Sequence, residues 1–140
     1  MSGDTTSTGL ARLEWVLAEV NVKIFVLELG ANDGMRGIPV KNIKKNLRKI
    51  ISIVKKKYPE CKIILAEMKA FPNMGIKFTS EFNHSFAEVA KTENVVLMPF
   101  LLKGVAGEKK LNQEDGIHPT AEGYRIVAQN VYTFLEKFLL

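Results

Sequence analysis

The chain has 140 residues, 46% of them hydrophobic and 25% charged, and a formal net charge of +5. This length fits one domain, and the apolar content excludes an intrinsically disordered chain. The single cysteine, Cys61, excludes an internal disulfide and a four-cysteine zinc site. No apolar run reaches the roughly 18 residues that suggest a membrane span. The start Met1-Ser2-Gly3-Asp4 lacks the basic residues and apolar stretch of a signal peptide.

Apolar residues at helical spacing predict four helices. The first covers about residues 9–19, and the second begins near Ile43 and ends before Pro59. The third covers about residues 80–92, and Thr120 can cap the fourth, which is the last element of the chain.

Three apolar runs predict buried strands, over residues 22–29, 62–68 and 95–100. Strands that alternate with helices indicate an α/β fold with a parallel sheet covered on both faces. We expect one domain over residues 1–140, without repeats or linkers. Functional sites in such folds lie at the carboxyl ends of the strands. That rule selects the loops 30–39, 69–77 and 101–119.

The positive charge is concentrated on the predicted second helix. Its lysines are Lys41, Lys44, Lys45, Lys49, Lys55, Lys56 and Lys57. No aromatic residue is interleaved with them, so we interpret this stretch as a solvated helix face and expect no nucleic-acid partner. A site for a polyanion is the alternative.

Asp115 and His118 are the strongest candidates for chemistry. Their spacing across a tight turn lets the carboxylate reach one ring nitrogen of the histidine and stabilise the imidazolium that forms when the other nitrogen takes a proton. The alternative is a turn in which Asp115 only caps backbone amides. The other histidine, His84, lies in the predicted third helix, away from its apolar face, and we interpret it as a surface residue.

Two further segments offer donors for a developing oxyanion. Asn32 follows the first predicted strand within Gly30-Ala31-Asn32-Asp33, where a side-chain amide can donate to such a charge. Gly3 precedes the first helix, and its backbone amide could be a second donor. The alternatives are an ordinary turn asparagine and a capped helix start.

Taken together and in this order, these segments resemble the SGNH (GDSL-type) hydrolases. The resemblance is strongest to the branch of thioesterase I, arylesterase and lysophospholipase. It covers residue 2 to the C-terminus. The matching segments are Ser2-Gly3-Asp4-Thr5-Thr6, the run 28–37 around Gly30-Ala31-Asn32-Asp33, the loop Pro72-Asn73-Met74-Gly75, and the run 112–119 around Asp115-Gly116-Ile117-His118.

The resemblance implies a carboxylic ester or thioester hydrolase with a Ser-His-Asp acyl-enzyme mechanism. It assigns Asp115 and His118 to the triad, and Gly3 and Asn32 to the oxyanion hole. The implied substrate is a small acyl ester or thioester, with no cofactor and no metal. The apolar residues Met35, Phe71, Met74 and Ile76 could line an acyl pocket, although core packing explains about half of them equally well.

The sequence departs from the family at the nucleophile, because the G-D-S-L block lies upstream of the segment where this chain starts. Ser2, Thr5 and Ser7 are only weak substitutes. We therefore expect a flavodoxin-like, three-layer α/β/α fold that is truncated at its N-terminus and lacks the first strand, the first helix and the second strand.

Loss of those elements would expose the strand over residues 22–29 as a long apolar edge, which predicts self-association. A catalytically inactive binding or assembly module on the same fold is the alternative to a hydrolase. The compartment stays open, although intact relatives are often periplasmic or secreted.

Overall fold

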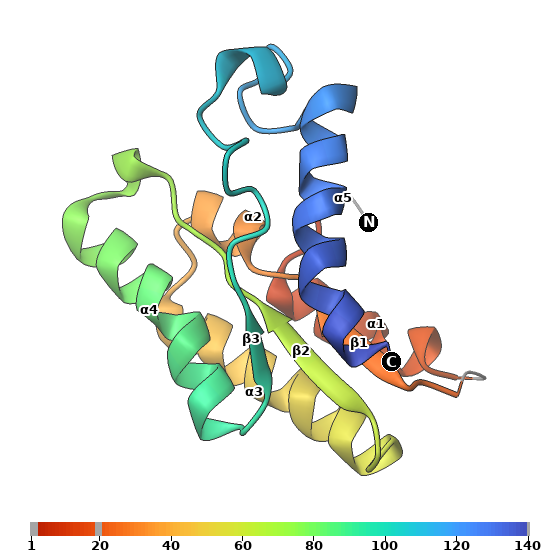
Figure 1. The fold of residues 1–140 in the computed structure, drawn as a ribbon. Coiled ribbons are helices and arrows are strands. Elements are labelled where there is room, and N and C mark those ends of the chain that lie inside the picture. The colour runs from red at the N-terminus through yellow and green to blue at the C-terminus, as the bar shows by residue number, and fades with distance from the viewer. Residues whose placement is uncertain (1–2, 19–20, 140) are drawn as a thin grey trace. The chain divides into compact units, whose positions relative to one another are not determined.

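The computed structural model describes residues 3–18 and 21–139. The chain divides into two compact units, residues 1–97 and 98–140, and each is considered by itself. Figure 1 shows the course of the chain. Among the described helices, none is both long and apolar enough to cross a membrane.

The first unit contains most of a three-stranded sheet. Its strands are β1 (Ile24–Leu27), β2 (Lys62–Ala66) and β3 (Val96–Met98), in the order β1-β2-β3. β1 and β2 are parallel, with Ile24 opposite Lys62 and Leu27 opposite Leu65. All three predicted strands are present, and β1 stands at one edge of the sheet, as predicted.

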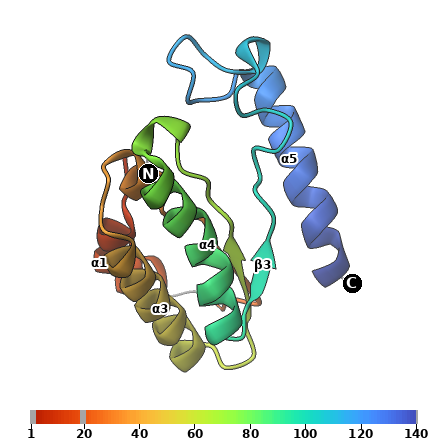
Figure 2. The ribbon, with the colours of Figure 1, turned by 90° about the vertical axis from the view of Figure 1, so that its left-hand side faces the viewer.

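Three helices, α1 (Thr6–Val16), α3 (Val40–Lys57) and α4 (Ile76–Thr92), lie on one side of this sheet, as Figure 2 shows. α3 packs between α1 and α4. Its apolar residues recur every three or four positions, so they form one buried stripe. The stripe comprises Val40, Ile43, Leu47, Ile50, Ile51 and Val54. β2 and α4 complete the core with Ile64, Leu65, Phe82, Phe86 and Val89.

Helix boundaries differ from the sequence prediction where local hydrogen bonds decide them. α1 begins three residues earlier than predicted, because Thr5 and Thr8 form a reciprocal capping box. The predicted loop 30–39 contains a short helix, α2 (Ala31–Met35). In the next loop a single 3-10 turn, η1 (Pro72–Met74), precedes α4. That helix starts directly after Gly75, four residues before the predicted start.

The second unit consists of an irregular segment followed by α5 (Ala121–Leu135) and the short turn η3 (Glu136–Phe138). Thr120 caps α5, as predicted, and accepts a hydrogen bond from the Gly123 amide. Within the irregular segment lies a 3-10 turn, η2 (Lys109–Leu111). η2 contacts α5, which fixes the segment before His118 against the helix that follows it.

Candidate functional site

Asp115 and His118 form a direct hydrogen bond, 2.7 Å between Asp115 Oδ2 and His118 Nδ1. The other carboxylate oxygen, Oδ1, accepts the backbone amides of Ile117 and His118 at 2.9 and 3.0 Å. Asp115 therefore both caps the turn and holds the ring, so the two interpretations considered for this pair coexist. The remaining ring nitrogen, Nε2, receives no hydrogen bond from the part of the chain that the structure describes, and it can act as a base.

The turn that carries this pair is closed by backbone bonds on both sides. The Gln113 amide donates to the His118 carbonyl at 2.8 Å, and Asn112 forms an isolated antiparallel bridge with Pro119. Gly116 has φ 67°, a conformation that glycine adopts without strain. Asn112, which is buried, donates to the carbonyls of Val105 and Glu108 at 2.7 and 2.9 Å. The pair is thus held by a loop with its own internal support.

Hydrogen bonds lower the pKa of the Asp115 carboxyl group. The hydrogen bond from His118, followed by the two backbone amides, lowers the pKa of Asp115 from 3.8 to about 2. The carboxylate is therefore ionised at neutral pH and can stabilise an imidazolium. Both side chains remain open to solvent, with 54% of His118 and 44% of Asp115 exposed.

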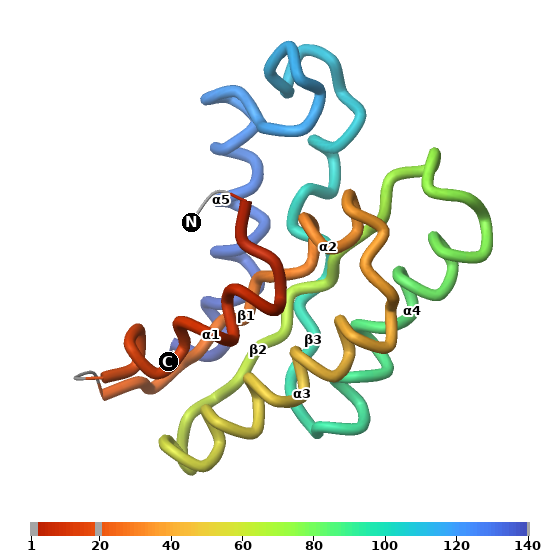
Figure 3. Tube along the Cα trace, turned by 180° about the vertical axis from the view of Figure 1, so that it is seen from behind, coloured from red at the N-terminus to blue at the C-terminus, as the bar shows by residue number. Residues whose placement is uncertain are grey.

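The first unit brings Asn32 and Gly3 together. Asn32 Nδ2 donates to the Asp4 carbonyl at 2.9 Å, and Arg36 donates to the Gly3 carbonyl at 3.3 Å. Gly3 has φ 81°, so its backbone is suited to glycine. The turn before α1 and the turn after β1 consequently meet at one end of the unit, as the Cα trace in Figure 3 shows.

A buried carboxylate fastens these two turns. Asp33 accepts hydrogen bonds from the Thr6 amide at 2.7 Å and from the Thr6 hydroxyl at 2.6 Å. Asn46 of α3 donates to the same hydroxyl at 3.1 Å. No sequence pattern marked Thr6 or Asn46 as functional. Asn46 carried a weak signal, because it is a polar residue among the closely spaced apolar positions of α3.

Arg36 is a third residue that no sequence pattern marked as functional. Its guanidinium lies beside Gly3, and a side chain added at Gly3 would meet it at 3.9 Å. The neighbouring Asp4 is engaged by Arg12, through Nε at 2.8 Å and through the second guanidinium nitrogen at 2.7 Å. Arg36 is thus a cation beside one proposed oxyanion donor.

The residues proposed for an acyl pocket all belong to the first unit. Met35 ends α2, and Met74 is close to Gly37, 3.5 Å from the position of an added side chain. Met74 and Ile76 line an open hollow of about 460 Å³ at the start of α4. Ile76 is 92% exposed and Phe71 is 37% exposed, so core packing does not account for these two side chains.

The weak substitutes for a nucleophile differ in their surroundings. Ser2 lies outside the described residues. The hydroxyl of Thr5 accepts the Thr8 amide as part of the capping box, and Thr5 is buried, whereas Ser7 is exposed. Cys61 precedes β2, and burial raises the pKa of its thiol. His84 is exposed on α4, as predicted, and its Nδ1 bonds the Ser80 carbonyl at 2.7 Å.

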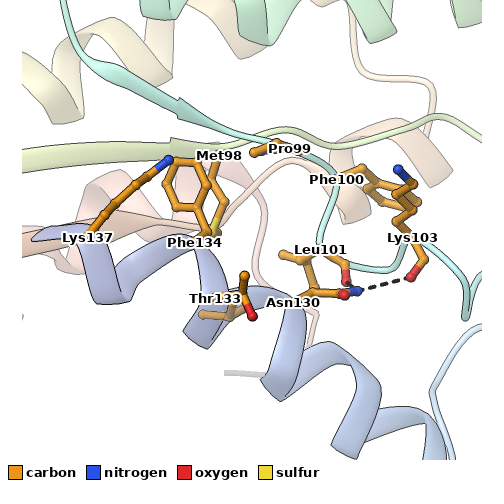
Figure 4. Close-up of a pocket in the computed structure, with 10 residues that line it drawn as sticks. Met98, Pro99, Phe100, Leu101, Lys103, Asn130, Thr133, Phe134 and Lys137 are labelled. Carbon is orange, nitrogen blue, oxygen red and sulfur yellow. Dashed lines mark hydrogen bonds between the residues drawn. The ribbon is translucent and has the colours of Figure 1, made fainter.

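The second unit also has a largely apolar pocket of about 380 Å³, shown in Figure 4. Asn130 closes part of it by donating to the carbonyls of Leu101 and Lys103 at 2.9 and 3.0 Å. Lys137 lies 4.0 Å from the centroid of the Phe134 ring. No residue predicted for the site is among those that line this pocket.

Comparison with known proteins shows the family of the chain. The model of the GDSL-like lipase/acylhydrolase family matches residues 1–126. The chain is 37% identical to an arylesterase of Vibrio mimicus over 99% of its own length and 68% of the relative's. It is 33% identical to the thioesterase 1/protease 1/lysophospholipase L1 of Escherichia coli K12, over 91% of this chain and 61% of that protein.

The match to a solved structure supports the same family. The psychrotrophic esterase EstA from Pseudoalteromonas sp., inhibited by monoethylphosphonate, matches with a TM-score of 0.92 and 31% identity, over 99% of this chain and 74% of the other. The chain therefore belongs to the GDSL-like lipase/acylhydrolase family. The resemblance noted in the sequence and the predicted α/β fold of the SGNH hydrolases, of which this chain forms a part, are both confirmed. The chain spans about two thirds of the length of the arylesterase that it matches.

Proposed function

We infer that this chain contributes the acid–base pair and the oxyanion donors of an enzyme that hydrolyses small acyl esters or thioesters. The observation that carries this proposal is the 2.7 Å hydrogen bond between Asp115 and His118, with Nε2 of the histidine left available. Membership of the acylhydrolase family supports the reaction class.

In this proposal His118 is the general base and Asp115 fixes its tautomer. A hydrogen bond from Nδ1 to a carboxylate leaves the lone pair of Nε2 free to take a proton from an attacking hydroxyl or water. The imidazolium that results then donates this proton to the leaving group. The low pKa of Asp115 supports the role, because the carboxylate stays charged while the ring changes its protonation state.

Gly3 and Asn32 are proposed as the donors that stabilise the oxyanion. One amide hydrogen of Asn32 is used by the Asp4 carbonyl, which orients the group and leaves the second hydrogen for a ligand. A preorganised donor of this kind is worth about 10²- to 10³-fold in rate. Met35, Phe71, Met74 and Ile76 are proposed to contact the acyl chain.

A serine hydroxyl is the nucleophile of the proposed acyl-enzyme mechanism, and none of the described serines or threonines is assigned to it. Oxyanion donors and binding alone retain roughly 10³- to 10⁴-fold catalysis over water in triad enzymes without a nucleophile. We therefore expect the chain to hydrolyse an activated short-chain ester slowly, with the oxyanion donors supplying this residual catalysis and His118 adding general-base assistance to an attacking water.

A chromogenic short-chain ester assay on the purified chain tests this proposal. The His118→Ala variant should lose about 10²-fold or more of the rate, because the general base is removed while the oxyanion donors remain, and the Asn32→Ala variant should lose about 10²- to 10³-fold. His84→Ala and Asn42→Ala are matched controls, because both alter exposed residues of the same types. Equal rates for His118→Ala and His84→Ala would exclude His118 as the base. They would also favour the alternative, a binding module without catalysis.

A serine-directed phosphonate separates two mechanisms in the same assay. Insensitivity is expected if water is the attacking group. Stoichiometric inhibition would instead identify a hydroxyl of this chain, with Ser7, Thr5 or Ser2 as the candidates, and mass spectrometry of the adduct would locate it.

We also propose that the chain self-associates through β1. This strand is at the sheet edge, and its outward Val26 is 37% exposed. Unpaired strand edges of apolar character pair readily with other chains. Light scattering should give a mass above that of one chain, and Val26→Lys should lower it. A monomeric, folded wild-type protein would contradict this part of the proposal.

A further inference from the structure

α3 carries eight basic side chains and no acidic one, and the structure divides them into sets with different surroundings. The side that faces α4 is neutralised. Lys44 and Arg48 pair with Glu88 at 3.0 and 3.2 Å, and Arg48 also lies 3.7 Å from Glu93. Lys55 donates to the Glu93 carbonyl. These side chains contribute to the packing of α3 against α4.

Four other lysines form a separate line along α3, here called the basic ridge. Its members are Lys41, Lys45, Lys49 and Lys56, all of them exposed. At about 100° per residue they fall within an arc of roughly 80°, and they span about 22 Å along the helix. This arc is opposite the buried stripe, so the ridge is the outermost line of α3. Within the described residues no ion pair or hydrogen bond joins the ridge to an acidic side chain.

The basic ridge works against the stability of its own helix. Lysines four residues apart repel one another, which applies to Lys41 with Lys45 and to Lys45 with Lys49. Lys41 also lies in the first helical turn, where the helix dipole disfavours a cation and no acidic residue is present. Packing does not explain these charges, because the side chains lie opposite the core.

We propose that the basic ridge is an interaction surface for an anionic phospholipid membrane. A straight row of ammonium groups on the outer side of a helix complements a plane of phosphate headgroups. Each lysine near such a surface strengthens binding to the membrane about five-fold. Nucleic acid fits less well, because the ridge has no aromatic side chain for base stacking and no arginine fork for guanine. The inference is independent of the proposed catalytic roles and needs no enzymatic activity.

The test is sedimentation of the full chain with vesicles of equimolar phosphatidylcholine and phosphatidylglycerol. The ridge variant combines K41Q, K45Q, K49Q and K56Q. The control variant combines K23Q, K77Q, K91Q and K110Q, which are exposed lysines on other segments. Each variant removes four positive charges from the same +5 total, so a difference between them reports position and not net charge. Glutamine forms helices nearly as well as lysine, and circular dichroism should confirm the fold of both variants.

The wild-type chain should sediment with these vesicles, and added salt should weaken the binding. The ridge variant should bind on the order of several hundred-fold more weakly. The control should lose less than about ten-fold, because its charges are scattered. Failure of the wild-type chain to sediment, equal losses in the two variants, or equal binding to pure phosphatidylcholine would overturn the proposal. Tighter binding to duplex DNA at the same salt concentration, lost in the ridge variant, would reassign the surface to nucleic acid.

Discussion

The Asp33 carboxylate accepts both the amide and the hydroxyl hydrogen of Thr6, at 2.7 and 2.6 Å, and only 1% of Asp33 is exposed. These bonds join the start of α1 to the turn after β1, which are the two segments that carry Gly3 and Asn32. Asp33 is therefore a structural support for both proposed oxyanion donors, although it is not itself expected to touch a substrate.

Replacing Asp33 by Asn should lower the free energy of unfolding by about 2–4 kcal/mol, because an amide cannot accept two charge-assisted bonds from Thr6. Urea denaturation measures this change. Glu60→Gln is the control, since it makes the same chemical change at an exposed position. A difference of less than about 0.5 kcal/mol between the two variants would show that the Asp33 bonds contribute little.

Alanine substitutions at Gly30 and Gly75 can be compared to measure the effect of the close contact between Gly30 and Phe86. Both have positive φ, 119° and 86°, so alanine is strained at either position. A side chain at Gly30 would lie 2.8 Å from Cζ of the buried Phe86, whereas at Gly75 it would meet no atom within 4 Å. Gly75→Ala should cost about 1–2 kcal/mol, and Gly30→Ala about 1–3 kcal/mol more. Equal unfolding midpoints would contradict the contact with Phe86.

Replacing Gly123 of α5 by alanine should lower stability, which is the opposite of what helix propensity alone predicts. Alanine normally stabilises a helix by up to about 1 kcal/mol relative to glycine. A side chain at Gly123, however, would collide with the Leu111 carbonyl and lie 2.9 Å from Cβ of Pro119. Gly123→Ala should therefore destabilise the second unit by about 1–3 kcal/mol.

The same substitution should disturb the Asp115–His118 turn, because Leu111 and Pro119 bracket it. Hydrogen exchange of the His118 and Thr120 amides measures this effect. Gln129→Ala, on the exposed side of α5, is the control and should leave both amides unchanged. Unchanged protection in Gly123→Ala would mean that the turn does not depend on this close approach.

Asp115 should titrate with a midpoint near pH 2 in carbon-detected NMR. Its pKa is lower in the folded chain than its ordinary value of 3.8, so the bonds that it accepts stabilise the turn above pH 3.8 and are lost as the pH falls through 2. His118→Ala should raise this pKa toward 3.8, because the imidazole bond is the largest cause of the shift. The rise should be incomplete, since the backbone amides of residues 117 and 118 remain.

His84→Ala is the control for this titration and should leave the midpoint of Asp115 near 2. If His118→Ala also left it there, the backbone amides alone would hold the carboxylate, and Asp115 would be a turn cap without a role in orienting the histidine.

The sequence by itself determined the alternation of helices and strands, the buried stripe of α3 and the family, because periodicity and short motifs are local properties. It also placed Asp115 within reach of His118, since three residues across a turn leave little freedom. It did not anticipate α2 or the early starts of α1 and α4. Those features depend on local hydrogen bonds such as those of the Thr5–Thr8 capping box. Such bonds differ little in energy from the hydrogen bonds that the same segment could form as a loop.

Only the tertiary structure decided which distant polar residues meet. Asp33 lies 27 residues after Thr6, and Asn46 lies 40 residues after it. No local sequence pattern pairs either residue with Thr6. The tertiary structure likewise decides which basic residues of α3 have an acidic partner. Lys44 and Arg48 acquire Glu88 from α4, while Lys41, Lys45 and Lys49 acquire no acidic partner within the described chain. The physical reason is that helix packing selects which face of α3 meets α4, and the sequence of α3 contains no information about the charges that the neighbouring helix presents.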